Sequence, residues 1–600
     1  MRILTFIPIT VFALFLACNR HQEYNYPDAD AVYLNLTKTF VLNKDGSMVS
    51  TVEKKQKLLT YRSFQSLYGE TRIDYNPEFQ KLVINEASTV NPQNRTIKTP
   101  ENGFNQILPA FCEDSKAYSH LREMVVTHTG LERNAVINCA YTITTSAGKI
   151  PFLMGFEELQ SDCPIEQMNI VVKVPSGTAL HFKVLNTSVT PEVDKGSEYD
   201  SYSWKLKDIP QRIKEFRSGL VFSDIPALLF STQENMQTGI NFLLAQKAFS
   251  FFVNDEIKSY IDLAIKDKKT IPEKVLKIQE VVVNELKSLY IPSQLVGFQV
   301  RTPAEVWQSN SGTITEKACL LTSMLRAEGI SAEVVLGLPD CIGVEPLPVL
   351  LASEPIVKVS TQNGEVMLLS PDRINLGNFD ATGSQSTIIA LNTNQKGFKN
   401  QSSGSISVEG DITIDPHEML KGELNGTFTE LFNPYFEIIR NQGKCPLLLT
   451  DFAGTLGKFS ANQTDVHFKV DKGDELTKRG DLRFLQLKEA KTGLASMHLI
   501  AMPFTRKTEL NLGTSIRESY HVSYKLPDGY KLLNPVNIDL AKPGIGNLTV
   551  ILNQSGNIVE VTRKIYIAVP TVKPELYLAF KELIDSWNTT KYRQLILKKG

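Results

Sequence analysis

Hydrophobic and polar positions alternate with a period of two over most of the first 230 residues. The segment 32–59 alternates on both sides of Asp45-Gly46, a dipeptide typical of the tight turn of a β-hairpin. The later run SYSWKLKD places Tyr202, Trp204 and Leu206 on one face of a strand. Many short strands at close spacing predict an antiparallel β sandwich over residues 32–232.

The hydrophobic period becomes helical after residue 232. Residues 233–265 and 272–290 are predicted to be helices, because their apolar positions recur three and four residues apart. The runs ISAEVVLG, PIVKVST and EVMLLS then predict strands. Together they predict an α+β domain over residues 235–395.

One helix in this region is defined at both ends. Thr313 and Glu316 match a capping box, so the helix is expected to begin at Ile314. Gly329 is the expected C-terminal stop. Apolar residues occur on all sides of the segment, which predicts a helix buried nearly all round.

The last third of the chain returns to a β pattern. Residues 396–407 are polar and rich in Gly and Ser, which predicts a linker. Residues 408–600 are predicted to form a C-terminal β-rich domain that contains helices in GTFTELFNPYFEIIRN and KPELYLAFKELIDSW and ends on the strand RQLILKK. The sequence therefore predicts an α+β multidomain protein.

The N-terminus has the pattern of an export signal. Residues 1–17 carry one positive residue, Arg2, before an apolar run that is too short for a membrane span. Ala17-Cys18 resembles a bacterial lipobox, in which the cysteine is lipidated. Cys18 is therefore the expected membrane anchor and residues 18–31 a polar tether. A plain secretory signal with a chance cysteine is the alternative.

The expected location is the outer membrane. Only one acidic residue, Glu23, follows closely after the cysteine, which favours the periplasmic face over the cell surface. The charge of the chain argues against a nucleic-acid-binding protein. The net charge is −1 and no basic block occurs, so no nucleic-acid partner is expected.

Histidine and cysteine spacing predicts no metal or other cofactor. The eight histidines are scattered without ligand spacing, and the seven cysteines form no CxxC motif. Cys139 lies in an alternating run and is expected to be a core residue. The sequence does not decide whether Cys112 and Cys163 form a disulfide.

Several motifs, in order, resemble bacterial DUF3857 proteins that carry a transglutaminase-like domain. They are GLERNAVINCAYTITT, RTPAEVW, KACLLTSMLRAEGISAEVVLG and LYLAFKELIDSWNTTKYRQLILKK. The resemblance implies a papain/transglutaminase-like α+β fold for the middle domain, and in catalytic members a Cys–His–Asp triad.

All three triad positions depart from that pattern. Counting back from Lys317-Ala318, the nucleophile position holds Ile314. The histidine position holds Pro355 or Glu354, and the aspartate position holds Ser370. Asp372 stands two residues later.

The base is missing from the whole region, because no histidine lies between His181 and His417. Cys319 and Cys341 are the rival nucleophiles. Cys319 is five residues into the helix among apolar neighbours, which would raise its pKa, and Cys341 lies on a loop. The remaining histidines considered are expected to be surface or edge residues, not ligands: His128, His181, His467, His498 and His521.

These observations leave three hypotheses. The first is a non-catalytic, lipid-anchored envelope protein that binds a peptide, a glycan or another envelope protein through a degenerate cleft. The second is an active transglutaminase or cysteine protease with an unrecognised nucleophile or a base from another domain. The third is an accessory subunit of an outer-membrane transport or assembly complex.

Overall fold

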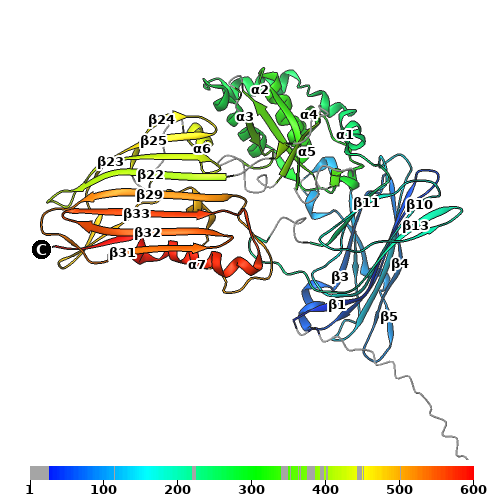
Figure 1. Cartoon of the computed structure of the whole chain (residues 1–600). Coiled ribbons are helices and arrows are strands. Elements are labelled where there is room, and N and C mark those ends of the chain that lie inside the picture. The colour runs from blue at the N-terminus through cyan, green and yellow to red at the C-terminus, as the bar shows by residue number, and fades with distance from the viewer. Residues whose placement is uncertain are drawn as a thin grey trace, which may run out of the picture.

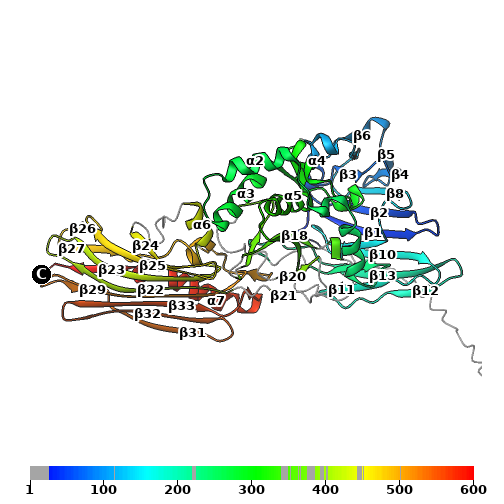
Figure 2. The ribbon, with the colours of Figure 1, turned by 90° about the horizontal axis from the view of Figure 1, so that it is seen from above.

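The computed structural model is β-rich, with several separate sheets and few helices, in keeping with an α+β chain of several domains. In both overall views the middle of the chain lies between two β-rich ends (Figures 1 and 2). The structure describes residues 26 and 28–599, apart from 114, 219–224, 340–348, 352, 362–363, 365, 375–385, 392–397, 400–402, 442–448, 450–451 and 500–501.

An eight-stranded sheet dominates the N-terminal part. It is mixed, which corrects the antiparallel prediction: β1 and β10 run parallel, with Lys38 opposite Ile170. Parallel neighbours need a long crossover, and more than a hundred residues separate these two strands. In spatial order the strands are β12 (Glu192–Lys195), β13 (Tyr199–Ile209), β10 (Ile165–Pro175), β1 (Ala31–Leu42), β2 (Met48–Leu58), β8 (Val136–Thr145), β4 (Gln80–Val90) and β5 (Thr96–Lys98).

Two three-stranded sheets cover one face of this large sheet. Phe230 of one small sheet packs on Phe40 of β1, with ring centroids 5.2 Å apart. Thr71 of the other lies against Cys139 of β8. Trp204, fully buried, lies in the core beneath the first. The small sheets are β11 (His181–Leu185), β14 (Ala227–Ser231) and β9 (Met154–Glu158), and β3 (Glu70–Tyr75), β7 (Arg122–Thr127) and β6 (Phe104–Ile107).

The middle part packs helices against a five-stranded sheet. The predicted helix from Ile314 to Gly329 is confirmed as α5 (Ile314–Ala327), and Gly329 has a φ of +69°. The other helices are α1 (Met236–Leu244), α2 (Asp255–Ile265), α3 (Ile271–Glu285) and α4 (Pro303–Gln308). The sheet consists of β19 (Val366–Leu369), β18 (Glu354–Ser360), β17 (Ala332–Pro339), β20 (Ser386–Ala390) and β21 (Phe398–Lys399).

Two helix predictions in the middle part were too long. The predicted helix 233–265 is broken between α1 and α2, where Phe251 adopts a left-handed conformation with φ 54°. The predicted helix 272–290 ends at Glu285, because the next residues form β15 (Lys287–Leu289), which pairs with β16 (Ser311–Thr313). Sheet pairing thus overrides helical spacing at the end of the second predicted helix.

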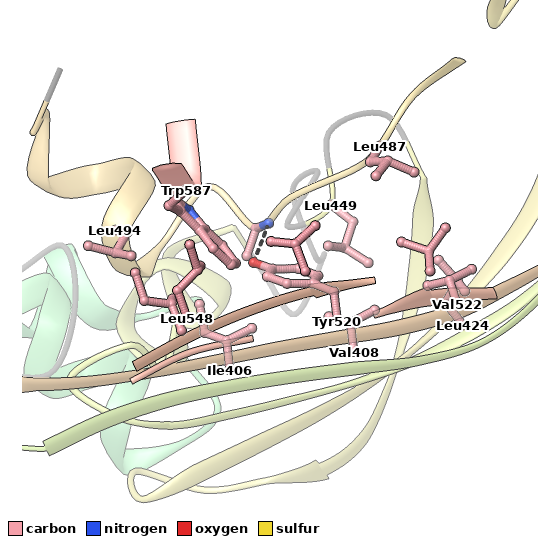
Figure 3. Packing of buried hydrophobic residues seen from close by; sticks show 14 of the residues in the cluster. Ile406, Val408, Leu424, Leu449, Leu487, Leu494, Tyr520, Val522, Leu548 and Trp587 are labelled. Atoms are coloured by element: carbon pink, nitrogen blue, oxygen red, sulfur yellow. Dashed lines mark hydrogen bonds between the residues drawn. The ribbon is translucent and has the colours of Figure 1, made fainter. Parts of the chain in front are cut away.

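A second eight-stranded sheet forms the C-terminal part, and α7 (Tyr577–Asn588) lies against it. Tyr520 and Trp587 meet in its core, where the Tyr520 hydroxyl accepts a hydrogen bond from the backbone of Ala490 (Figure 3). The final strand is β35 (Gln594–Lys598), as predicted. The sheet contains β24 (Ala453–Phe459), β25 (Gln463–Lys472), β23 (Leu420–Glu430), β22 (Ser403–Ile414), β29 (Ser515–Lys525), β33 (Ile558–Ile567), β32 (Gly546–Ser555) and β31 (Val536–Lys542).

The predicted linker and one predicted C-terminal helix need correction. Residues 403–407 of the linker 396–407 belong to β22, because Ile406 and Val408 alternate with serine and are buried. The predicted helix 426–441 is too long, since residues 426–430 belong to β23 and only α6 (Tyr435–Arg440) is helical. Strand pairing with β22 and β25 decides this segment.

The possible bridge between Cys112 and Cys163 is not formed: both thiols are free and buried. Cys139 is a buried residue of β8, as expected. Within the described residues, no helix is long and apolar enough to cross a membrane, and no cluster of side chains could hold a metal ion.

The N-terminal part also contacts the C-terminal part directly. The Glu215 carboxylate accepts hydrogen bonds from the Thr508 backbone N–H at 2.8 Å and from its hydroxyl at 2.6 Å. The backbone N–H of Asn511 donates to the carbonyl of Arg217 at 2.8 Å. Burial alone would raise the pKa of Glu215, but the hydrogen bonds from Thr508 and the charge of Arg506 lower it.

Candidate functional site: the cleft at the start of helix α5

The start of α5 is fixed by a complete capping box. The Thr313 hydroxyl accepts from the Glu316 backbone N–H at 3.3 Å, and the Glu316 carboxylate accepts from the Thr313 N–H at 2.8 Å. Ile314 and Thr315 therefore occupy the first helical positions, where backbone N–H groups have no acceptor within the helix. The same positions face the cleft described below.

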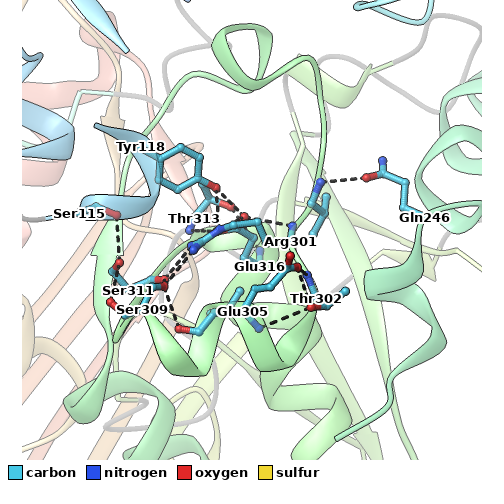
Figure 4. Close-up of polar contacts among 12 residues, drawn as sticks. Ser115, Tyr118, Gln246, Arg301, Thr302, Glu305, Ser309, Ser311, Thr313 and Glu316 are labelled. Atoms are coloured by element: carbon cyan, nitrogen blue, oxygen red, sulfur yellow. Dashed lines mark hydrogen bonds and ion pairs between the residues drawn. The ribbon is translucent and has the colours of Figure 1, made fainter. Parts of the chain in front are cut away.

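Glu316 also forms a buried ionic network beneath the cleft (Figure 4). Its side chain is fully buried, and Arg301 donates to both carboxylate oxygens at 2.9 Å. The hydroxyl of Tyr118, from the N-terminal part, donates to the same carboxylate at 2.5 Å. Burial and the neighbouring carboxylate raise the pKa of Tyr118. This network joins α5 to a residue 198 positions earlier in the chain.

Lys317, the next residue, is fully buried as well. Its ammonium donates to the Leu286 carbonyl and to the Ser288 hydroxyl, each at 2.8 Å. Burial lowers its pKa to about 8. Lys317 thus ties the helix to the end of α3 and to β15, a role that its apolar flanks in the sequence did not indicate.

A cleft of about 560 Å³ opens at the start of α5. Ile314 forms part of its wall, and Glu354 and Pro355 of β18 and Asp372 line it too. The structure therefore brings together three of the four positions that the sequence singled out for the triad, namely the nucleophile and base positions and the late aspartate.

Ser370 itself is not among the residues lining the cleft. It is buried, and its hydroxyl donates to one oxygen of Asp372 at 2.6 Å. The other oxygen of Asp372 accepts from the hydroxyl of Tyr290 at 3.1 Å. At the third triad position, the acid that faces the cleft is thus Asp372, and the serine at the predicted position orients it.

The remaining lining is apolar, aromatic or neutral polar. Glu354 and Asp372 are the charged residues among the described residues that line the cleft, and both are acidic. Neither cysteine nor histidine occurs among those lining residues. Tyr290, whose ring is well exposed, also lines the cleft, and nothing in the sequence marks it, because a single tyrosine at the end of a predicted helix carries no signal.

Cys319 is fully buried inside α5, and burial strongly raises the pKa of its thiol. It does not line the cleft. Both observations agree with the apolar neighbours and raised pKa that the sequence indicates for Cys319. Cys341 and Cys18 lie outside the described residues.

The histidine expectations hold only in part. His128 is buried, not at a surface or edge, and its Nε2 lies 2.8 Å from the Thr71 hydroxyl. Burial lowers its pKa to about 4, so its ring is neutral. His467 and His521 are exposed strand residues.

Two family models match the chain. Residues 44–213 match DUF3857 and residues 494–597 match DUF3858, each described as a domain of unknown function with a solved structure. The expected resemblance of the N-terminal part to DUF3857 is thus confirmed over that range. A search of curated proteins gave no match.

One solved structure is similar along nearly the whole chain. It is a protein of Parabacteroides distasonis described as a "putative protease", with a TM-score of 0.70, 24% identity, and coverage of 95% of this chain and 99% of that one. A Cytophaga hutchinsonii protein described as a "putative cysteine protease" has 11% identity over 61% of this chain and 95% of that one, but its TM-score of 0.17 carries no argument. The first likeness establishes the fold and leaves the chemistry to the residues of the cleft.

Proposed function

We propose that the chain is an envelope binding protein whose cleft at the start of α5 holds a ligand without thiol chemistry. The observation that carries this proposal is Ile314, which stands in the cleft wall where similar transglutaminase-like enzymes carry cysteine. In a thiol mechanism the helix N-terminus and a nearby base stabilise the thiolate. An isoleucine side chain can neither ionise nor attack a carbonyl.

The base position supports the same proposal. Pro355 carries no titratable group, and Glu354 pairs with Arg373 at 3.3 Å. The sequence has no histidine between His181 and His417, so the middle part supplies no imidazole. Losing both the nucleophile and the base removes the covalent route.

The lining of the cleft indicates the class of ligand. Apolar and aromatic side chains form most of the wall, and two carboxylates supply its charge. Such a surface favours a peptide segment that presents an apolar side chain beside a lysine or arginine. The N–H groups at the start of α5 offer donors to a peptide carbonyl.

Ile314→Arg is expected to weaken peptide binding at least tenfold. The longer cation would fill the cleft and repel a basic peptide, and Ile314 is exposed enough to tolerate the change. The measurement passes a tryptic digest of β-casein, in which almost every peptide ends in lysine or arginine, over the immobilised full-length protein. Mass spectrometry then counts the retained peptides.

Ile314→Val is the matched control and is expected to retain peptides within about threefold of wild type. The proposed binding function fails if wild type retains no peptide above a blank resin. It fails equally if Ile314→Arg retains the same peptides as wild type.

We also propose that Cys18 anchors the chain to the outer membrane, facing the periplasm. The support is the Ala17-Cys18 motif after an apolar run. Cys18→Ala is expected to move the protein from the membrane fraction to the soluble envelope fraction, read by immunoblot. A variant that stays in the membrane with an unchanged N-terminal mass would refute the anchor.

A further inference from the structure

A second cavity, of about 760 Å³, lies in the N-terminal part. Its floor is the covered face of the large sheet, with residues from β1, β2, β8 and β10. One side is formed by β3 and the other by β9, which belong to the two small sheets. The cavity therefore occupies the space that the two small sheets leave between them, and Phe156 is the one described residue that it shares with the lining of the α5 cleft.

The charged side chains that line this cavity form ion pairs with one another, with one exception. Five basic and four acidic residues line it. Every acid has a basic partner in the lining, and one lysine, Lys54, is left over. The pairs are Lys38–Glu157 at 2.5 Å, Arg72–Glu70 at 2.7 Å, Arg212–Glu158 at 3.2 Å and Lys214–Asp162 at 2.9 Å.

Lys54 sits on the floor, in the middle of the sheet. In the strand register it stands between Leu36 of β1 and Cys139 of β8, so its side chain shares their covered face. It is mostly buried, and within the described residues its ammonium has no hydrogen-bond or ion-pair partner. Burial lowers its pKa. The ammonium therefore opens onto the cavity, where it is available to pair with an anion.

The surroundings of Lys54 are aromatic and apolar. Tyr33, Tyr68 and Tyr141 line the cavity, together with Phe156 and Met168. Burial raises the pKa of Tyr33 and Tyr68 and brings that of Tyr141 to about 12, so all three hydroxyls stay protonated and can donate. The site thus combines one free positive charge with phenol donors and an apolar wall.

We propose that this cavity binds a small organic carboxylate with an apolar body, whose carboxylate pairs with Lys54. The proposed ligand carries a single negative charge, because all other charged residues that line the cavity are already paired. The size and the aromatic wall fit an apolar body, and ligand sites of this kind are mostly apolar with a few placed polar groups.

The test uses 11-(dansylamino)undecanoic acid and its methyl ester, which differ by one negative charge and one methyl group. Fluorescence titration of the full-length protein is expected to show saturable binding of the acid. Lys54→Met should raise the dissociation constant of the acid at least tenfold and leave that of the ester within about threefold. Lys54→Arg keeps the charge and should keep acid binding.

Lys55→Met is the matched control, because Lys55 is exposed on the opposite face of the same strand. It should change neither constant, and Ile314→Arg should change neither, since the α5 cleft is a different site. The proposal is overturned if wild type shows no saturable binding, or if Lys54→Met leaves acid binding unchanged. Equal loss of acid and ester would overturn it too.

A second measurement needs no variant. Reductive methylation of wild-type lysines, mapped by mass spectrometry, should be slowed at Lys54 more by the acid than by the ester at equal occupancy, while Lys55 reacts at one rate throughout. An unchanged rate at Lys54 in the presence of saturating acid would overturn the pairing.

Discussion

Glu316→Gln will destabilise the middle of the chain by about 3–5 kcal/mol, the cost of breaking a buried ion pair from one side. The substitution keeps the size of the side chain and removes its charge. Arg301 would then face a neutral amide, which keeps one acceptor oxygen and turns an NH2 group toward the guanidinium in place of the two charged contacts at 2.9 Å. The Tyr118 hydroxyl would lose its charged acceptor as well.

Glu305→Gln is the matched control for this prediction. Glu305 occupies the same position in the Thr302 capping box of α4, but it is exposed and its carboxylate accepts from Thr302, not from the Arg301 guanidinium. Its loss should cost about 1 kcal/mol, the usual value of a cap.

Hydrogen exchange of peptides from α4 and α5, followed by mass spectrometry, measures both variants. Glu316→Gln should speed exchange of the α5 amides by at least a hundredfold under conditions in which opening is at equilibrium. Equal protection in the two variants would show that the network carries no special stability.

Local structure around α5 could be predicted from the sequence because its signals are local. Thr313 and Glu316 form a capping box within four residues, and Gly329 adopts the left-handed conformation that ends the helix. The same holds for the final helix and strand of the chain. Only a few residues decide each of these boundaries.

Contacts between distant segments could not be predicted. Tyr118 meets Glu316 across 198 residues, and nothing near either residue marks the pairing. Strand pairing likewise turned residues 403–407 into the start of β22. Its partners, β23 and β29, lie farther along the chain.

The sequence located only part of the candidate site. The position counted back from Lys317-Ala318 led to Ile314, which does line the cleft. The aspartate was placed two residues early, because a strand pattern fixes which face a residue takes but not where the strand gives way to a turn. The structure shows Ser370 holding Asp372 toward the cleft.

Restoring a thiol to the cleft will not restore turnover. Ile314→Cys would place a sulfur at the helix N-terminus, yet Pro355 offers no proton acceptor and no imidazole orienter exists in this part of the sequence. Enzymes of this kind owe factors of about 10⁶ or more to the complete set of groups. The expected rate for Ile314→Cys is therefore that of the uncatalysed reaction, within about tenfold.

The thiol of Ile314→Cys should still react with iodoacetamide, because its place in the cleft wall is accessible. Labelling without turnover would separate the presence of a thiol from the presence of a mechanism. Turnover by this single variant would show that a base exists which the proposal does not include.

The most direct test of the central claim is an assay of the full-length wild-type protein for thiol chemistry. Dansylcadaverine incorporation into dimethylcasein measures transamidation, and new peptide termini in the same casein measure hydrolysis. The proposal predicts neither above the buffer blank, with or without iodoacetamide, and no change in Cys319→Ser or Cys341→Ser. Turnover that iodoacetamide or Cys341→Ser abolishes would contradict it.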